Sequence, residues 1–196
     1  MFENTPRSIE MRREILLRHA SATMTDDERA RLFGLPEGCR IRESAKIISI
    51  ENFKCGHHVW IGENVVLDAS GGLEIGNFTQ IGVAVLVWTH SSHLQALASE
   101  TCISSESIIK KPVKIGSNCW IVGPTVISPG ITIGDRVQVL PMSVVTKDIA
   151  SGSVVRGSPI EKLERLEERI TQLERTIEDH LCLKTNAYSS PAERDS

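Results

Sequence analysis

At 196 residues, the chain is long enough for one domain with a substantial core and some appendages. Its net charge of -3 provides no general attraction to nucleic acid or to acidic lipid headgroups. The first ten residues lack the apolar stretch of a signal peptide, and no run approaches the roughly 20 apolar residues of a membrane span, so we expect a cytoplasmic protein. Its five cysteines lack paired metal-site spacing, which favours reduced side chains over disulfides or a zinc site.

Residues 1–38 have the patterns of two short helices. The segment from Ser8 to Ala20 places aliphatic side chains among charges, and Thr25 followed by Glu28 has the spacing of a capping box. We expect these residues to form a helical cap over the first strands of the repeat that follows. Such a cap would protect an edge that otherwise invites pairing with another chain.

Aliphatic residues recur at every sixth position within residues 39–157. The longest unbroken series is Ile115, Ile121, Ile127, Ile133, Val139 and Val145. A helix would spread this period around its surface, whereas a three-sided prism brings residues six apart to equivalent places on successive sides. Eighteen residues would then complete one coil of three short parallel strands, and we expect about five coils. An antiparallel sandwich is the alternative, but its strands alternate at period two.

The same step extends towards the N-terminus in shorter blocks. These blocks are Ile75, Ile81 and Val87, then Ile61 and Leu67, then Ile41, Ile47 and Phe53. A two-residue slip separates the first two blocks, and the pair Gly71-Gly72 accounts for it, because glycine suits the sharp bends of such corners.

The repeat lapses between Val87 and Ile115, which predicts a loop inserted at residues 89–112. Solenoids tolerate such loops on one face, and the loops often carry function. His90 lies at the predicted root of the loop and His93 lies further out, so His90 is the better candidate for a catalyst. An imidazole can accept a proton from a hydroxyl or an amine near neutral pH. The alternative is that His90 only bonds a nearby carbonyl.

Residues 158–184 carry a heptad seam of apolar side chains amid Glu and Arg, at Leu163, Leu166, Ile170, Leu173 and Ile177. This pattern predicts an amphipathic helix that needs a partner surface. The remaining residues, 185–196, are polar, and we expect a disordered tail.

Three motifs in the second half of the chain belong together: Ile131-Thr132-Ile133-Gly134-Asp135, Ser143-Val144-Val145-Thr146-Lys147-Asp148 and Val154-Val155-Arg156-Gly157-Ser158-Pro159. With Thr89-His90 and Asn118-Cys119-Trp120-Ile121, they resemble the hexapeptide-repeat acyltransferases over residues 40 to 160. The chain is particularly similar to the branch with maltose and galactoside acetyltransferases and bacterial polysaccharide O-acetyltransferases. This resemblance implies an all-β core, a left-handed parallel β-helix, with N-terminal helices and a C-terminal helix.

The resemblance also implies an activity: direct transfer of an acetyl group from acetyl-CoA, without a metal, to a hydroxyl or amine of a sugar, sugar nucleotide or surface-polysaccharide unit. Transfer to oxygen is favoured over transfer to nitrogen. His90 matches the catalytic base of the family, and His93 and Trp120 would border the acceptor. Positions that line the coenzyme A groove in the family match Gly123, Pro141, Thr146 and Lys147. The family is trimeric, so a homotrimer with sites between subunits is expected.

Some residues depart from the family pattern. Leu140-Pro141-Met142 replaces small residues near the pantetheine arm, and a proline there removes one backbone donor. A catalytically silent assembly subunit is therefore an alternative. A zinc enzyme of the γ-carbonic anhydrase kind is another, with nitrogens from His57, His58, His90 and His93, although their spacing does not resemble the ligand spacing of that family.

Overall fold

The computed structural model describes residues 5–98, 107–158 and 170–178. The chain divides into two units, Met1–Ser158 and Pro159–Ser196. In the second unit, residues 170–178 are helical. Ser158 is a bend, whereas residues 159–169 and 179–184 of the predicted helix, and the predicted tail at 185–196, lie outside the described residues. No helix in the described part of the chain is both long enough and apolar enough to cross a membrane.

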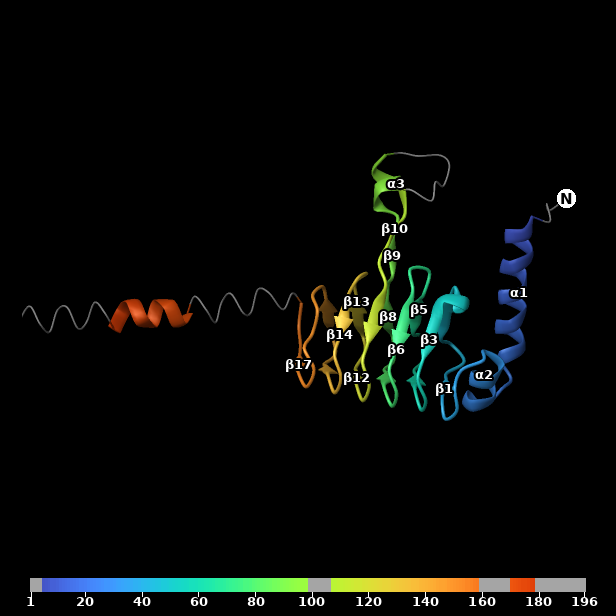
Figure 1. Ribbon diagram of the computed structural model, residues 1–196, viewed down its shortest axis with the longest axis horizontal. Coiled ribbons are helices and arrows are strands. Elements are labelled where there is room, and N and C mark those ends of the chain that lie inside the picture. Colours follow the sequence, from blue (N-terminus) through green and yellow to red (C-terminus); the bar gives the residue numbers. More distant parts are fainter. Residues whose placement is uncertain (1–4, 99–106, 159–169, 179–196) are drawn as a thin grey trace, which may run out of the picture. The chain divides into compact units, whose positions relative to one another are not determined.

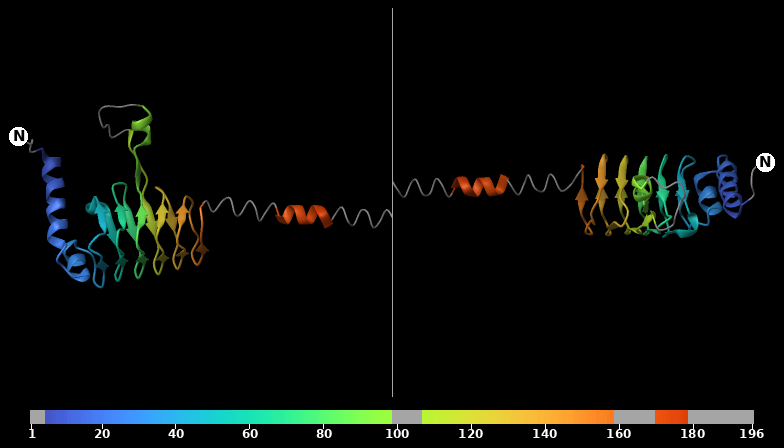
Figure 2. Two further views of the ribbon diagram at one scale, coloured as in Figure 1. Left: turned by 180° about the vertical axis from the view of Figure 1, so that it is seen from behind. Right: turned by 90° about the horizontal axis from the view of Figure 1, so that it is seen from above.

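The first unit is built on a parallel β-solenoid with three sheets, whose coils stack along one axis (Figures 1 and 2). The first sheet contains β1 (Arg40–Ile41), β4 (Trp60–Ile61), β7 (Gln80–Ile81), β12 (Trp120–Ile121), β15 (Gln138–Val139) and β17 (Val154–Val155). The second contains β2 (Lys46–Ile48), β5 (Val66–Asp68), β8 (Val85–Val87), β13 (Thr125–Ile127) and β16 (Ser143–Val145). The third contains β3 (Phe53–Cys55), β6 (Leu73–Ile75), β11 (Val113–Ile115) and β14 (Thr132–Ile133). The fold class predicted from the repeat is confirmed.

Aliphatic side chains fill the interior in the predicted register. All six residues of the unbroken series are buried, none more than 3% exposed. Ile121 pairs with Ile81 below it and with Val139 above it, and Ile127 is placed likewise between Val87 and Val145. Each inward side chain therefore stacks on its equivalents in neighbouring coils, and burial of this column drives folding.

The predicted coil length of eighteen residues holds between Val113 and Val145, whereas the last coil has sixteen, because Val139 pairs with Val155. Ile121 and Val139 pair eighteen residues apart, but Ile41 pairs with Ile61, and Ile61 with Ile81, twenty residues apart. The two extra residues lie at the corner between the second and third sheets. In the first coil that corner holds the short 3-10 helix η1 (Ile50–Asn52), and in the second it holds the Gly71-Gly72 pair. All the insertions in the repeat thus occur at one corner.

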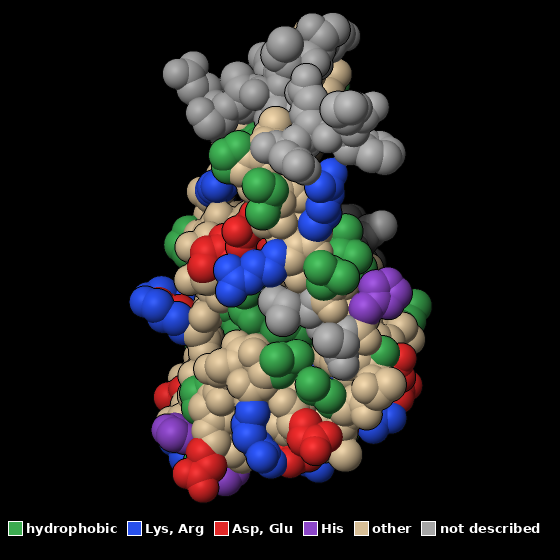
Figure 3. All heavy atoms as spheres, turned by 90° about the vertical axis from the view of Figure 1, so that its right-hand side faces the viewer, with side chains coloured by type: hydrophobic (Ala, Val, Ile, Leu, Met, Phe, Trp, Pro, Cys, Tyr) green, Lys and Arg blue, Asp and Glu red, His purple; other side chains and the backbone are tan. Residues whose placement is uncertain are grey.

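Two helices precede the first coil: α1 (Pro6–Ser21) and α2 (Asp26–Leu32). The predicted capping box is present, with the Glu28 carboxylate accepting a 2.9 Å bond from the Thr25 N–H. α2 packs on β1 and buries Ala30 in the core. Figure 3 views this end of the molecule, where hydrophobic side chains are interspersed with charged ones. Ile9 and Leu16 of α1 are among the exposed hydrophobic residues.

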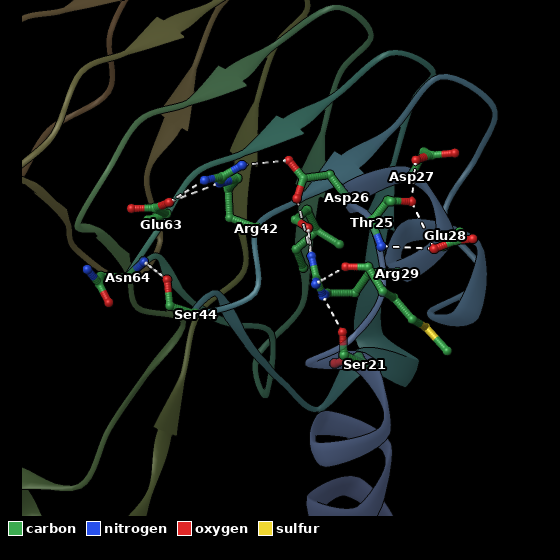
Figure 4. A network of polar contacts seen from close by, with 12 residues as sticks. Ser21, Thr25, Asp26, Asp27, Glu28, Arg29, Arg42, Ser44, Glu63 and Asn64 are labelled. Carbon is green, nitrogen blue, oxygen red and sulfur yellow. Dashed lines mark hydrogen bonds and ion pairs between the residues drawn. The ribbon is translucent and has the colours of Figure 1, made fainter.

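A buried arginine joins the two helices to the solenoid (Figure 4). Arg29 donates from Nε to the Ser21 carbonyl at 3.0 Å, and from its two Nη atoms to the carbonyls of Ile41 and Met24 at 2.6 Å each. An ion pair with Asp26 at 3.3 Å balances its charge. The planar guanidinium can bond several carbonyls at once because it offers five donors in a fixed arrangement.

Replacing Arg29 by alanine should destabilise the protein by about 3 kcal/mol, because three carbonyls lose their donor and Oδ1 of Asp26 loses its ion pair. The matched control is Arg31→Ala in the same helix. Arg31 also pairs with an aspartate, Asp27, but its side chain is 74% exposed, so the expected loss is below about 0.5 kcal/mol. Thermal or urea unfolding of both variants measures the difference, and equal losses would contradict the anchoring role of Arg29.

Candidate active site

The inserted loop leaves the solenoid at the corner between the second and third sheets. After β8 the chain passes through Trp88 and Thr89 into β9 (His90–Ser91), which pairs in antiparallel fashion with β10 (Ile109–Lys110). α3 (His93–Leu97) follows β9, and residues 99–106 of the loop lie outside the described residues. Figure 1 shows this two-stranded ribbon projecting from the coils. His90 therefore lies where the loop joins the rigid body.

A buried carboxylate holds the imidazole of His90. The Nδ1 atom of His90 lies 2.7 Å from Oδ2 of Asp68 and 3.0 Å from Oγ of Ser70. Asp68 ends β5, one coil below, and its side chain is fully buried, whereas that of His90 is 32% exposed. Because an ionised carboxylate can only accept, we assign the hydrogen to Nδ1, which leaves the lone pair on Nε2. The ring is thus oriented as a proton acceptor.

Asp68 is ionised at neutral pH. Burial alone would raise its pKa, but hydrogen bonds from Ser70, the Thr89 N–H and His90 outweigh burial and lower the pKa from 3.8 to about 2. Besides His90, Oδ2 accepts bonds from the Thr89 N–H at 2.8 Å and from the Thr89 hydroxyl at 3.1 Å, while Oδ1 accepts from the Ser70 N–H at 3.1 Å. A fixed negative charge at this place favours the imidazolium that forms when Nε2 takes up a proton.

Neighbouring residues fix the root of the loop. The buried Thr89 hydroxyl lies 2.8 Å from the Asp68 carbonyl and accepts a 2.8 Å bond from the Gly71 N–H. Trp88 contacts the imidazole of His90 edge to face, with ring centroids 6.4 Å apart. His93 lies further out, and its Nδ1 is 2.8 Å from the Ser91 hydroxyl. Only the first of the two loop histidines is therefore held by the solenoid itself.

No protein-family model matches this sequence. WcaF of Escherichia coli is 31% identical over 131 residues, which cover 66% of this chain and 68% of WcaF. Its name describes it as an acetyltransferase of colanic acid biosynthesis. A hexapeptide-repeat acetyltransferase of Vibrio cholerae, solved in complex with acetyl-CoA, is 27% identical, with a TM-score of 0.63 over 81% of this chain and 89% of that chain. The chain belongs to the hexapeptide-repeat acetyltransferases.

A galactoside acetyltransferase solved in complex with coenzyme A has the same fold. Its TM-score is 0.65 over 81% of this chain, at 22% identity. The family predicted from the sequence motifs is confirmed by the likeness to WcaF and to the Vibrio cholerae protein. In the described part of this acetyltransferase, no three His, Cys, Asp or Glu residues gather as a metal site.

Four of the other candidate residues of this acetyltransferase lie at the two corners that flank the second sheet, and the fifth, Trp120, lies on the first sheet. Thr146 and Lys147 follow β16 and share the corner of His90, further along the solenoid axis. Gly123 and Pro141 follow β12 and β15, at the corner between the first and second sheets. Trp120 points outward from the first sheet and is 49% exposed. A single chain does not bring the second group to His90, and the roles of all five residues stay predictions.

Gly123 has a structural reason to be glycine. A side chain there would place its Cβ 1.5 Å from the Val83 carbonyl oxygen of the preceding coil. The need for glycine at this position therefore follows from the close approach of two backbones, whether or not a cofactor binds nearby.

Asp68 and Ser70 were missed by the sequence-based prediction. A charged residue at the end of the aliphatic stretch Val65-Val66-Leu67 was the available signal. To use it, one must know that the coil has twenty residues here, because that length sets Leu67 beside Val87 and brings Asp68 next to the loop root.

Proposed function

We propose that the protein transfers an acetyl group from acetyl-CoA to a hydroxyl of a sugar-containing acceptor, with His90 as the general base. The observation that carries this proposal is the Asp68–His90 pair, in which a buried, ionised carboxylate holds the imidazole with its Nε2 lone pair available. The pair lies at the root of a loop on a solenoid whose family acts in acetyl transfer. Positioned bases of this kind contribute roughly 10²–10⁴-fold in rate.

The chemical step needs no covalent enzyme intermediate. Nε2 takes the proton of the acceptor hydroxyl as its oxygen attacks the thioester carbonyl, and Asp68 stabilises the resulting imidazolium. The new C–O bond forms, the C–S bond then breaks, and the thiolate of coenzyme A takes the proton back from Nε2. Holding both substrates together contributes up to ~7–11 kcal/mol in favourable geometry.

Acetyl-CoA is the donor that the family suggests, since the Vibrio cholerae protein was solved with it. We propose that Thr146 and Lys147 contact it along the corner of His90, with Gly123 and Pro141 contributed by a neighbouring copy. His93 and Trp120 would then border the acceptor. These residues lie at the two corners that flank the second sheet. A single site can include both groups only if a second chain lies against this sheet or one of these corners.

The outward face of the second sheet supports self-association. Val66, Leu86, Val126 and Val144 form one row in register along this face, and all four are half-buried. The corresponding row of the third sheet is exposed and polar, with Lys54, Glu74, Lys114 and Thr132. An apolar row in register, beside a face whose row is polar, is typical of an interface. We propose a homotrimer assembled through this face.

Val126→Glu should dissociate the assembly, because it places a charge in the middle of the apolar row. The matched control is Thr132→Glu, which adds the same charge to the exposed row of the third sheet beside Lys114. Light scattering measures the mass of both variants and of the unchanged protein. A trimer that survives Val126→Glu, or a wild-type monomer, would contradict the proposed interface.

The activity itself is tested by supplying acetyl-CoA with a panel of sugars and sugar nucleotides, and by following the free thiol of released coenzyme A. Acceptor-dependent thiol release that fails in His90→Ala is the expected result. A silent assembly subunit predicts no thiol release with any acceptor. Mass spectrometry of the product then distinguishes O-acetylation from N-acetylation.

A further inference from the structure

A groove of about 510 Å³ lies on the third sheet beside the root of the inserted loop. Its walls come from the turn before β6, from strands β3, β6 and β11, and from β10 of the loop ribbon. Ser70 forms part of the wall and is also the residue whose hydroxyl contacts Nδ1 of His90. The groove therefore ends one hydrogen bond away from the imidazole, and its volume is that of a site for a small molecule.

Lys110 stands directly opposite His90 in the loop ribbon. The two are Cα partners in the antiparallel ladder of β9 and β10. Because the Lys111 N–H donates to the Thr89 carbonyl at 2.8 Å, they form a non-hydrogen-bonded pair, the kind in which opposed side chains are closest. Opposed residues of such a pair project from the same face of a ribbon. Lys110 and His90 thus share one side of the loop root, and Lys110 also lines the groove.

The charges of the groove are unevenly balanced. Lys54, Lys110 and Lys114 line it, against Glu51 and Glu74. Lys114 is paired with Glu74 at 3.4 Å, whereas Lys54 and Lys110 form no ion pair with any other described residue. Two uncommitted ammonium groups beside a single carboxylate favour a ligand that carries negative charge, in a protein whose net charge is otherwise -3.

We propose that this groove binds an anionic group of the acceptor, a carboxylate or a phosphate attached to the sugar, and that Lys110 selects it. The inference rests on the proposed acetyl transfer and adds the acceptor class: a uronic acid or a sugar phosphate. Lys110 holds the charged group from its side of the ribbon while the hydroxyl to be acetylated reaches Nε2 of His90. Lys110 is a specificity-determining residue, and it takes no part in the proton transfer.

The test compares charged acceptors with neutral ones that carry the same ring hydroxyls. Methyl uronides of glucose, galactose and mannose are assayed beside the matching methyl uronamides, and glucose 1-phosphate beside methyl glucoside forms the phosphate arm. Wild-type protein is expected to prefer charged members, and the arm with the lower KM distinguishes carboxylate from phosphate. Preference for the neutral members would overturn the inference while leaving acetyl transfer intact. Absence of turnover with every acceptor would contradict the proposed function itself.

Lys110→Ala should raise KM for the charged acceptor by about 10- to 100-fold, the usual value of one charge-assisted bond, with kcat and the KM for acetyl-CoA unchanged. Lys110→Arg should restore most of the affinity. Arg40→Ala is the matched control, because it removes one exposed positive charge from the outward face of the first sheet, away from the groove. An equal rise in KM for the neutral acceptor, or a rise in KM for acetyl-CoA instead, would overturn the assignment.

Discussion

His90→Ala is expected to lower kcat by at least about 10²-fold while acetyl-CoA still binds. The variant removes the only imidazole among the described residues that Asp68 holds at the loop root, so no group remains to take the acceptor proton. Binding is retained because the proposed contacts to coenzyme A come from other residues. Free-thiol release gives kcat, and calorimetric titration with acetyl-CoA gives the affinity.

The control for His90 is His93→Ala in the same loop. His93 is exposed, and its ring is hydrogen-bonded to the hydroxyl of Ser91 in the loop, so its loss should raise KM for the acceptor more than it lowers kcat. Unchanged turnover in His90→Ala would reject the general base. Equal losses of kcat in the two variants would show that the histidines are ranked wrongly.

Asp68→Asn is expected to cost about 10²-fold or more in kcat, although it changes no atom that touches substrate. Both carboxylate oxygens accept bonds, from the N–H groups of Ser70 and Thr89 and from Nδ1 of His90. The side-chain amide of asparagine has one acceptor oxygen and one NH2 donor, so its NH2 group would face at least one of these N–H donors. The amide is also neutral and cannot stabilise the imidazolium. Substrate affinities should change little, which distinguishes a positioning role from a binding role.

The stability of the Asp68→Asn variant provides a second readout. Because the pKa of Asp68 is lowered to about 2, its ionised form stabilises the folded protein by about 2 kcal/mol above pH 4, and this contribution is lost as the pH falls through about 2. The difference in melting temperature between wild type and Asp68→Asn should therefore shrink between pH 4 and pH 2. A difference that is constant over this range would contradict an ionised, hydrogen-bonded Asp68.

The six-residue period was sufficient to predict the solenoid because the interior of each coil must be filled by an apolar side chain from each of its three strands. A residue such as Ile121 must point inward on every coil, while Trp120 beside it must point outward, so the alternation of a short strand follows from the sequence. The corners are less constrained. Phe53 continues the six-residue step from Ile47, but it pairs with Leu73, and Cys55 takes the place level with Ile75. Extra residues at a corner shift the register without disturbing the apolar pattern on either side.

The candidate site was predictable only in part for the same reason. His90 could be found because it lies where the inserted loop interrupts the repeat, and this interruption is visible in one continuous stretch of sequence. Its partners Asp68 and Ser70 lie about one coil earlier, and their contact with His90 depends on the length of that coil and on how sharply the Ser70-Gly71-Gly72 turn bends. Lys110 becomes informative only through its pairing with His90 across a loop of some twenty residues.

A crystal structure of the full chain with coenzyme A bound would show where the thiol lies relative to His90. We expect the thiol sulfur beside Nε2 of His90, with room between them for a hydroxyl oxygen, in a cleft between that chain and its neighbour. Coenzyme A bound elsewhere on the solenoid, or an Nε2 atom turned away from the thiol into protein, would contradict this expectation.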